Sequence, residues 1–183
     1  MKYAAVGILC FLIALLLTAC AQPGTADPEI GAALLKPFKT ELQTALKTGL
    51  ADGPATAIGI CKNRAPQIAT QQSINGVHMG RTSHRLRNPA NQAPAWAQAV
   101  LDRYLVDSFD RTPTSVVISN RLHGYVEPIL LQPVCVMCHG QDLAPEIATQ
   151  IKAQYPMDKA VGFQPGDLRG VFWVEYPAPI NRQ

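Results

Sequence analysis

The sequence is poor in charged and aromatic residues and contains no run of lysine or arginine. Charged residues make up 16% of the 183 residues, aromatic residues make up 7%, and the formal net charge is only +3. Nucleic-acid-binding proteins carry a basic patch or stripe, so the sequence excludes nucleic acid as a partner. Internal repeats are missing as well, which excludes a repeat array. Proline is abundant, with 15 residues, and predicts several loops around a modest core.

The one long apolar run lies at the N-terminus. Residues 4–17, AAVGILCFLIALLL, follow the positive charge of Lys2. The run has the length of a secretory signal and is short for a membrane span, which needs about 20 residues. It ends in LTAC, and small residues followed by Cys20 resemble the bacterial lipobox, where the signal is cut before an acylated cysteine. We therefore expect residues 1–19 to be a lipoprotein signal peptide and Cys20 to be the lipidation site. The alternative is an uncleaved N-terminal anchor.

Lipidation would place the folded part of the chain outside the cytoplasm, on a membrane surface. We expect a periplasmic, lipid-anchored protein in which residues 20–28 form a polar tether. Ala21 gives no inner-membrane retention signal, so the outer membrane is preferred. Residues 29–183 suit a single domain with its own core.

Hydrophobic periodicity predicts an α+β fold, with an antiparallel sheet flanked by helices and a pair of helices at its N-terminus. We expect helices at residues 29–50, 54–72, 95–109 and 144–154. We expect strands at residues 114–119, 125–131 and 168–174, where β-branched residues gather between turns. Residues 73–94 are rich in glycine, asparagine, proline and arginine and predict an ordered loop or short strands.

Two cysteines and a histidine are packed closely in "VCVMCHGQ", residues 134–141. Cys135, Cys138 and His139 match C-x-x-C-H, the attachment signal of c-type haem. Two thiols one helical turn apart can add to the two vinyl groups of a porphyrin, and the adjacent imidazole can then bind the iron. The motif therefore predicts one covalently bound haem c, with His139 as an iron ligand.

Three other chemistries use closely spaced cysteines. Structural zinc needs about four protein ligands, and the sequence has no second pair of cysteines to complete such a site. A redox dithiol is expected in a βαβ unit, which the predicted order of elements does not contain. A disulfide across so short a loop would leave His139 without a role.

The second axial ligand of the iron stays open at this point. The candidates are Cys61, His78, Met79, His84, His123 and Met157. Methionine is the common partner in electron-transfer cytochromes, and we expect Met79 and Met157 to lie in loops. Cys61 differs from the others because it has no disulfide partner in an oxidising compartment. It shares a helix face with Ile58, Ala65 and Ile68, and Fe(III) would remove the cost of burying its thiolate.

Three arginines, Arg81, Arg85 and Arg87, cluster before Asn88-Pro89. Guanidinium groups pair with carboxylates, so we expect these arginines to bind the haem propionates. The alternative is a solvated basic loop. Asp167 and Arg169, in "PGDLRG", are expected to fix the turn before the last strand.

Four motifs resemble, in this order, a bacterial family of exported c-type haem proteins whose best-described member is cyanobacterial. They are "AIGICKNRAPQIA", "HMGRTSHRLRNPANQAPAW", "CVMCHG" and "YPMDKAVGFQPGDLRGVFWV", and the resemblance extends over residues 29–176. It implies a PAS-like haem domain, one haem c and His/Cys axial ligation. Carried over to this sequence, His139 is the proximal ligand and Cys61, through "ICKNRAP", is the distal one.

The resemblance implies a redox or gas-ligand sensor, because loss of a thiolate ligand on reduction would open the iron to CO or NO. The alternative is a small periplasmic electron-transfer cytochrome with a redox partner protein. We do not expect an enzyme, since a peroxidase needs an open distal position and Cys61 would occupy it.

Overall fold

The computed structural model of the chain describes residues 25–179. The predicted signal peptide, Cys20 and the first part of the predicted tether lie outside the described residues. Within residues 25–179, no helix is long and apolar enough to cross a membrane.

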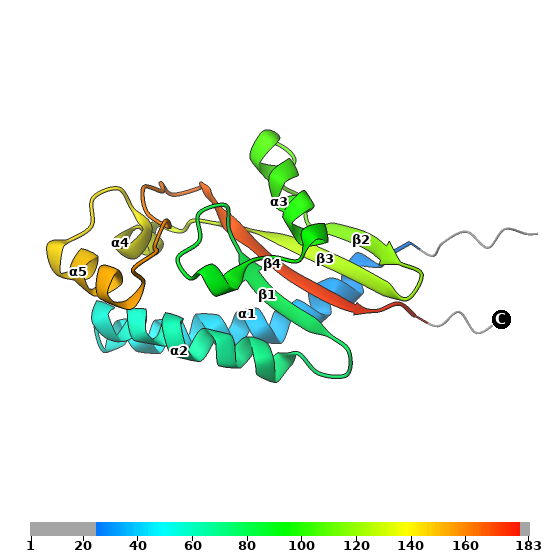
Figure 1. Cartoon of the computed structure of the whole chain (residues 1–183), viewed down its shortest axis with the longest axis horizontal. Coiled ribbons are helices and arrows are strands. Elements are labelled where there is room, and N and C mark those ends of the chain that lie inside the picture. The colour runs from blue at the N-terminus through cyan, green and yellow to red at the C-terminus, as the bar shows by residue number, and fades with distance from the viewer. Residues whose placement is uncertain (1–24, 180–183) are drawn as a thin grey trace, which may run out of the picture.

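A four-stranded antiparallel sheet forms the centre of the described residues (Figure 1). The strands are β1 (His78–Thr82), β2 (Thr114–Ser119), β3 (Leu122–Leu130) and β4 (Leu168–Pro177), in the order β1-β4-β3-β2. Helices α1 (Pro28–Ala51) and α2 (Pro54–Gln72) cover one face of the sheet, and α3 (Ala95–Val106) covers the other. The predicted α+β fold is confirmed.

The α1–α2 pair packs on the sheet through a buried apolar cluster. Asp27 caps α1 by accepting the N–H of Glu29, and Pro28 occupies the first turn, where its missing N–H costs nothing. Leu35 and Phe38 of α1 then meet Tyr125 of β3 and Val174 of β4. Gly31 lies directly over Tyr125, because a Cβ at this position would overlap the tyrosine side chain.

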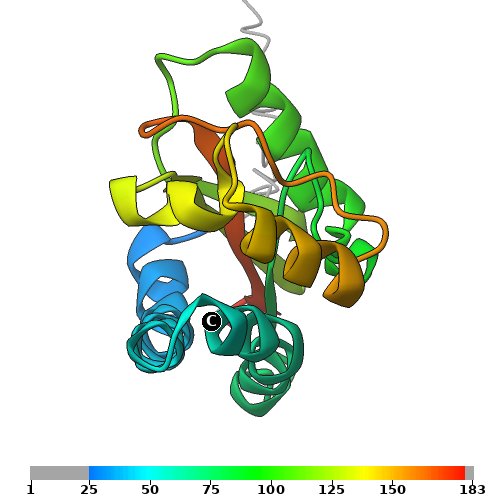
Figure 2. The ribbon, with the colours of Figure 1, turned by 90° about the vertical axis from the view of Figure 1, so that its left-hand side faces the viewer.

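The far end of the sheet carries the cysteine motif and two short helices. Strand β3 runs into a 3-10 turn, Pro133–Cys135, and then into α4 (Val136–His139). Helix α5 (Pro145–Gln154) follows and packs on α2. Viewed from this end, α4 and α5 lie above the α1–α2 pair (Figure 2). This arrangement brings α2, which is far from the cysteine motif in the sequence, next to it in space.

Two expectations about local structure are wrong. The third helix ends at Val106 instead of residue 109, and Phe109 is 99% exposed. The cause is Asp107, whose carboxylate accepts the N–H groups of Phe109 and Asp110 and turns the chain out of the helix. Met79 was expected in a loop, but it is buried in strand β1. This five-residue edge strand was too short for its alternation to be recognised.

Candidate functional site

The two motif thiols lie in the segment that leads from β3 into α4. Cys135 and Cys138 are half-buried free thiols, so the structure contains no disulfide between them. Cys135 packs against the buried cluster of Leu131 and Phe163. Cys138 packs against a different cluster, which contains Ile58 of α2. The motif is therefore held by separate apolar contacts at each thiol, and both sulfurs remain available for bonding.

The imidazole of His139 has a fixed tautomer. Its Nδ1 lies 2.7 Å from the carbonyl oxygen of Ala160, which can only accept, so Nδ1 carries the proton and Nε2 carries the lone pair. Arg169 Nε also lies 3.3 Å from this Nδ1. A ring nitrogen that carries a proton cannot accept a hydrogen bond, so the shorter contact, with Ala160, sets the tautomer. Arg169 is then a neighbouring cation of the ring. A hydrogen bond from Nδ1 to a backbone carbonyl is how histidines that bind a metal ion are commonly oriented.

Electrostatics around His139 keep its ring neutral. The pKa of His139 is lowered to about 3, first by burial and then by the positive charges of Arg169 and Arg87, with a smaller contribution from Arg81. The hydrogen bond to Ala160 acts in the opposite direction. A neutral imidazole is the form that binds a metal ion.

Residues 158–163, which we name the 158–163 loop, hold both the ring and the backbone of the motif. In addition to the contact with the His139 ring, Phe163 donates its N–H to the carbonyl of His139 at 3.0 Å. Gly162 donates its N–H to the carbonyl of Gly140 at 2.9 Å. The end of α4 is thus clamped from a segment about twenty residues further along the chain.

A buried ion pair anchors this loop. Arg87 Nε and one terminal nitrogen each lie 3.1 Å from a carboxylate oxygen of Asp158, and the two side chains are 10% and 8% exposed. The same guanidinium donates to the carbonyls of Cys138 and Ala160. Arg87 was expected to bind a haem propionate. In the structure its guanidinium instead contacts Asp158 and the motif backbone.

The other two predicted arginines also differ from each other. Arg85 donates to the carbonyl of Val161 at 2.8 Å and lies 4.3 Å over the ring of Phe163, so it packs on the outside of the 158–163 loop. Arg81 lines a cavity and forms no ion pair with any residue in 25–179. Of the three arginines expected to bind propionates, Arg81 alone lines the same cavity as Cys61.

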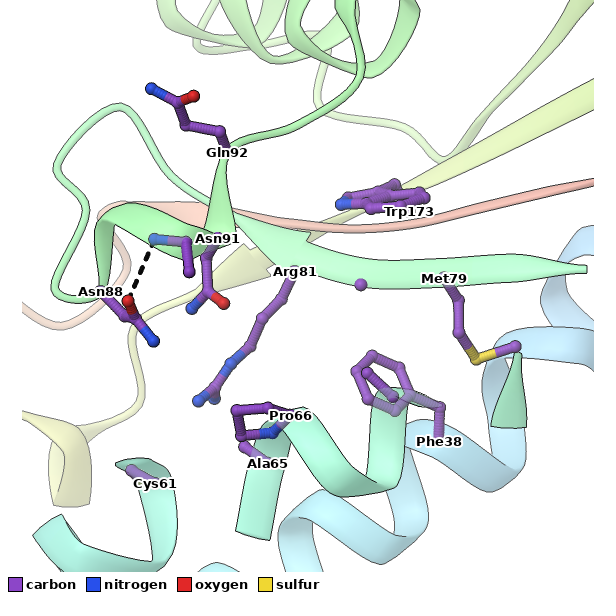
Figure 3. A pocket seen from close by; sticks show the side chains of 13 residues that line it. Phe38, Cys61, Ala65, Pro66, Met79, Arg81, Asn88, Asn91, Gln92 and Trp173 are labelled. Carbon is purple, nitrogen blue, oxygen red and sulfur yellow. Dashed lines mark hydrogen bonds between the residues drawn. The ribbon is translucent and has the colours of Figure 1, made fainter. Parts of the chain in front are cut away.

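That cavity has a volume of about 220 Å³ and lies between β1, α2 and the loop after β1. Figure 3 shows the guanidinium of Arg81 pointing down into it on the side where Cys61 lies, while Met79 lies at the opposite end. The side-chain amides of Asn88, Asn91 and Gln92 also line it. Its polar lining therefore offers a guanidinium and several amides, and no carboxylate.

Cys61 is also close to the cysteine motif. Ile58 lies one turn before Cys61 on α2 and belongs to the apolar cluster that Cys138 joins. The pKa of Cys138 is raised mainly by burial; Arg87 lowers it, and the thiols of Cys61 and Cys135 raise it further. Burial and then Cys61 raise the pKa of Tyr155 to about 12. The lone helical thiol and the C-x-x-C-H motif therefore share one electrostatic environment.

The remaining candidates for a second iron ligand lie elsewhere. His78 and His84 are exposed, and Met157 is 64% exposed. His123 is buried, but it packs edge-on against Tyr176 with the ring centroids 5.9 Å apart. Met79 shares the cavity but sits in the apolar cluster of α1 and the sheet. In the described residues, no group of three or more His, Cys, Asp and Glu side chains forms a compact metal site.

Sequence reasoning missed several residues of the site. Asp158 and Ala160 lie in a stretch without a recognisable motif, and only long-range contacts reveal their role. Arg169 was expected to fix a turn with Asp167. Asp167 does so by accepting the N–H of Gln164 at 2.7 Å, whereas Arg169 turns to His139. The asparagines in "RNPANQ" were visible as a cluster of amides, and this signal could have placed them in a polar pocket.

The site carries an excess of positive charge. Among residues 25–179, the charged side chains that act on His139 or on the adjacent Arg169 are Arg81, Arg87, Arg169 and Asp158. Three guanidinium groups against one carboxylate leave two positive charges uncompensated.

Together, the antiparallel sheet, the helices on both of its faces and the motif at its end define a PAS-like α+β domain. Residues 30–177 match the model of the Tll0287-like family, and the chain belongs to this family. The family resemblance predicted from the sequence motifs is confirmed.

A solved structure agrees with this fold. The chain is similar to the "cyanobacterial heme-protein Tll0287", with a TM-score of 0.55 and 22% identity over 84% of this chain and 98% of that chain. At this identity, the likeness shows the fold alone. No curated protein matches the chain.

Replacing Asp158 by alanine is expected to destabilise the protein strongly. It leaves the guanidinium of Arg87 buried without its counter-charge, which costs about 3–5 kcal/mol of unfolding free energy. The control is Lys39→Ala, which breaks the more exposed pair of Lys39 with Glu127 and should cost no more than about 1 kcal/mol. Urea unfolding of the two variants measures both values. Equal losses would show that the Arg87–Asp158 pair does not hold the loop.

Proposed function

We propose that this chain is a c-type haem protein that acts as a redox or gas-ligand sensor at a membrane surface. The observation that carries the proposal is the pairing of two free thiols, one turn apart, with an adjacent histidine whose Nε2 lone pair is left free by the bond from Nδ1 to Ala160. Thioether attachment needs the first feature and iron ligation needs the second.

Two further features of the site fit a haem. Arg81 has no ion-pair partner among residues 25–179, and its positive charge suits a haem propionate. Arg81 and the amides of Asn88 and Asn91 line a common cavity, and we infer that they hold the propionates there. A relative of similar fold is described as a heme-protein, which supports the same cofactor for this chain.

We infer that Cys61 is the second axial ligand. It faces the cavity from α2, next to the cluster that holds Cys138, and no other thiol in residues 25–179 lies outside the motif. A haem held here would supply one-electron redox chemistry and affinity for small gases. The thiolate of Cys61 would stabilise Fe(III), and its loss on reduction would give the protein two states that a sensor can read. The proposal includes no enzymatic turnover, because Cys61 occupies the position that a peroxidase needs open.

One observation favours electron transfer as a second candidate. Val134, Met137 and Val161 are exposed apolar side chains around the motif. An apolar collar around a haem edge is a suitable contact surface for a redox partner protein. In that case Cys61 would stay bound in both redox states, and this difference separates the two functions.

Replacing Cys61 by serine should change the ligand field of the oxidised protein. The wild-type protein is expected to be six-coordinate and low-spin with a thiolate EPR signature, and Cys61→Ser should lose that signature while it keeps its colour. Met79→Leu is the control and should leave the spectrum unchanged, because Met79 lies in the apolar cluster. Unchanged signals in Cys61→Ser would move the assignment to Met79 or a histidine.

The same samples, once reduced, separate sensing from electron transfer. A sensor whose thiolate leaves on reduction should bind CO, with a shift of its absorption bands. A reduced form that stays six-coordinate and ignores CO would assign the chain to electron transfer. Colourless wild-type protein, purified after export, would exclude both functions.

The membrane anchor is part of the proposal and rests on the sequence around Cys20. We infer acylation at this cysteine and a periplasmic location on the outer membrane. Replacing Cys20 by alanine should abolish the incorporation of labelled fatty acid into the protein. Incorporation at the wild-type level would contradict the lipobox assignment.

A further inference from the structure

We propose that Arg169 is a positioning residue for His139 and sets the redox poise of the site. Its guanidinium lies against the imidazole, lowers the electron density that the ring can donate and disfavours the oxidised iron. This inference rests on the proposed function, because it concerns the haem that His139 would bind.

The start of β4 places Arg169 against His139. Successive side chains of a strand point to opposite faces, so Leu168 enters the core and Arg169 points the other way, toward α4. Its Nε lies 3.3 Å from His139 Nδ1, and its guanidinium carbon lies 5.3 Å from the centroid of the Phe163 ring. The guanidinium is therefore fixed between the imidazole and the 158–163 loop.

Arg169 is a half-buried cation without a carboxylate partner among residues 25–179. Burial lowers its pKa to about 10, the charges of Arg81 and Arg87 lower it in the same direction, and Asp158 opposes them. An arginine guanidinium is charged at neutral pH. The protein thus keeps a positive charge beside the predicted iron ligand.

The acceptor of the His139 proton is also weakened. The carbonyl of Ala160 accepts from His139 Nδ1 at 2.7 Å and from Arg87 at 3.2 Å. An oxygen shared between two donors, one of them charged, draws less on the imidazole proton than an unshared one. The positive charge of Arg169 on the other side of Nδ1 also polarises the ring, so the imidazole donates less electron density to a metal.

Arg169 and Cys61 would therefore act on the redox equilibrium of the iron in opposite directions. The thiolate of Cys61 would favour Fe(III), whereas a cation near the opposite ligand disfavours the form with the extra positive charge. Arg169 therefore raises the midpoint potential relative to a site that lacks it. A sensor would be reduced at the potential that these opposing charges define.

Arg85 provides a matched control on the same ring. It lies 4.3 Å over Phe163 and is bonded to the carbonyl of Val161, but it has no contact with His139. Neutralising Arg85 also removes one positive charge beside the 158–163 loop, but it leaves the contacts of the His139 imidazole in place. Any difference between the two arginines then reports the contact with His139.

The experiment is a spectroelectrochemical titration of the intact haem-loaded protein and of Arg169→Gln, Arg169→Lys and Arg85→Gln. In Arg169→Gln, the reduction equilibrium should move at least about tenfold toward the oxidised form, which is 59 mV for a one-electron couple. Arg169→Lys keeps the charge and should stay within about threefold of the wild type, and so should Arg85→Gln. In the CO complex of the reduced protein, which is six-coordinate and diamagnetic, the ring N–H signal of His139 in 1H–15N spectra should move in Arg169→Gln and not in Arg85→Gln.

Equal shifts in Arg169→Gln and Arg85→Gln, or an unmoved His139 signal, would overturn the role of Arg169. If Arg169→Gln does not fold, Arg169→Lys still decides, because a tenfold shift with the charge retained contradicts the proposal. Colourless wild-type protein would instead overturn the proposed function itself.

Discussion

The hydrogen bond from His139 Nδ1 to the carbonyl of Ala160 is the constraint on which the site depends. It fixes the tautomer, orients the ring and leaves Nε2 as the coordinating atom. The bond exists because the 158–163 loop is held against the motif by the Arg87–Asp158 pair and by backbone bonds to His139 and Gly140. A neutral imidazole with one free lone pair, next to two free thiols, is then a feature of the folded chain before any cofactor is considered.

Charge links this constraint to the rest of the domain. Arg81, Arg87 and Arg169 each act on His139 through their positive charge, and among the described residues Asp158 pairs with Arg87. The sheet sets this arrangement, since Arg81 lies near the end of β1, Arg169 lies at the start of β4, and the antiparallel pairing of Arg81 with Phe172 brings both to the same end of the sheet. Helix α2 completes the site by presenting Cys61 to the cavity that Arg81 lines. In our proposal, a thiolate and a guanidinium act on the same iron from opposite sides.

The features that depend on neighbouring residues could be predicted from the sequence. The periodic helices at 28–51 and 54–72 and the strands after residue 114 were recoverable because each carries its own hydrophobic pattern. The motif formed by Cys135, Cys138 and His139 could be recognised as well, because its three residues lie close together in the sequence. The partners of that motif could not be predicted: Arg87 meets Asp158 across 71 residues and Arg169 meets His139 across 30. Such contacts depend on how the sheet closes, and so the different contacts of the three predicted arginines could not be foreseen.

The central claim is that His139 and Cys61 face a common metal from two separate elements. X-ray absorption at the iron edge of oxidised, exported wild-type protein tests it most directly, because it counts sulfur and nitrogen neighbours without a mutation. We expect one iron per chain, with one sulfur atom and five nitrogen atoms bound to it. An iron with nitrogen ligands alone, or protein without iron, would contradict it.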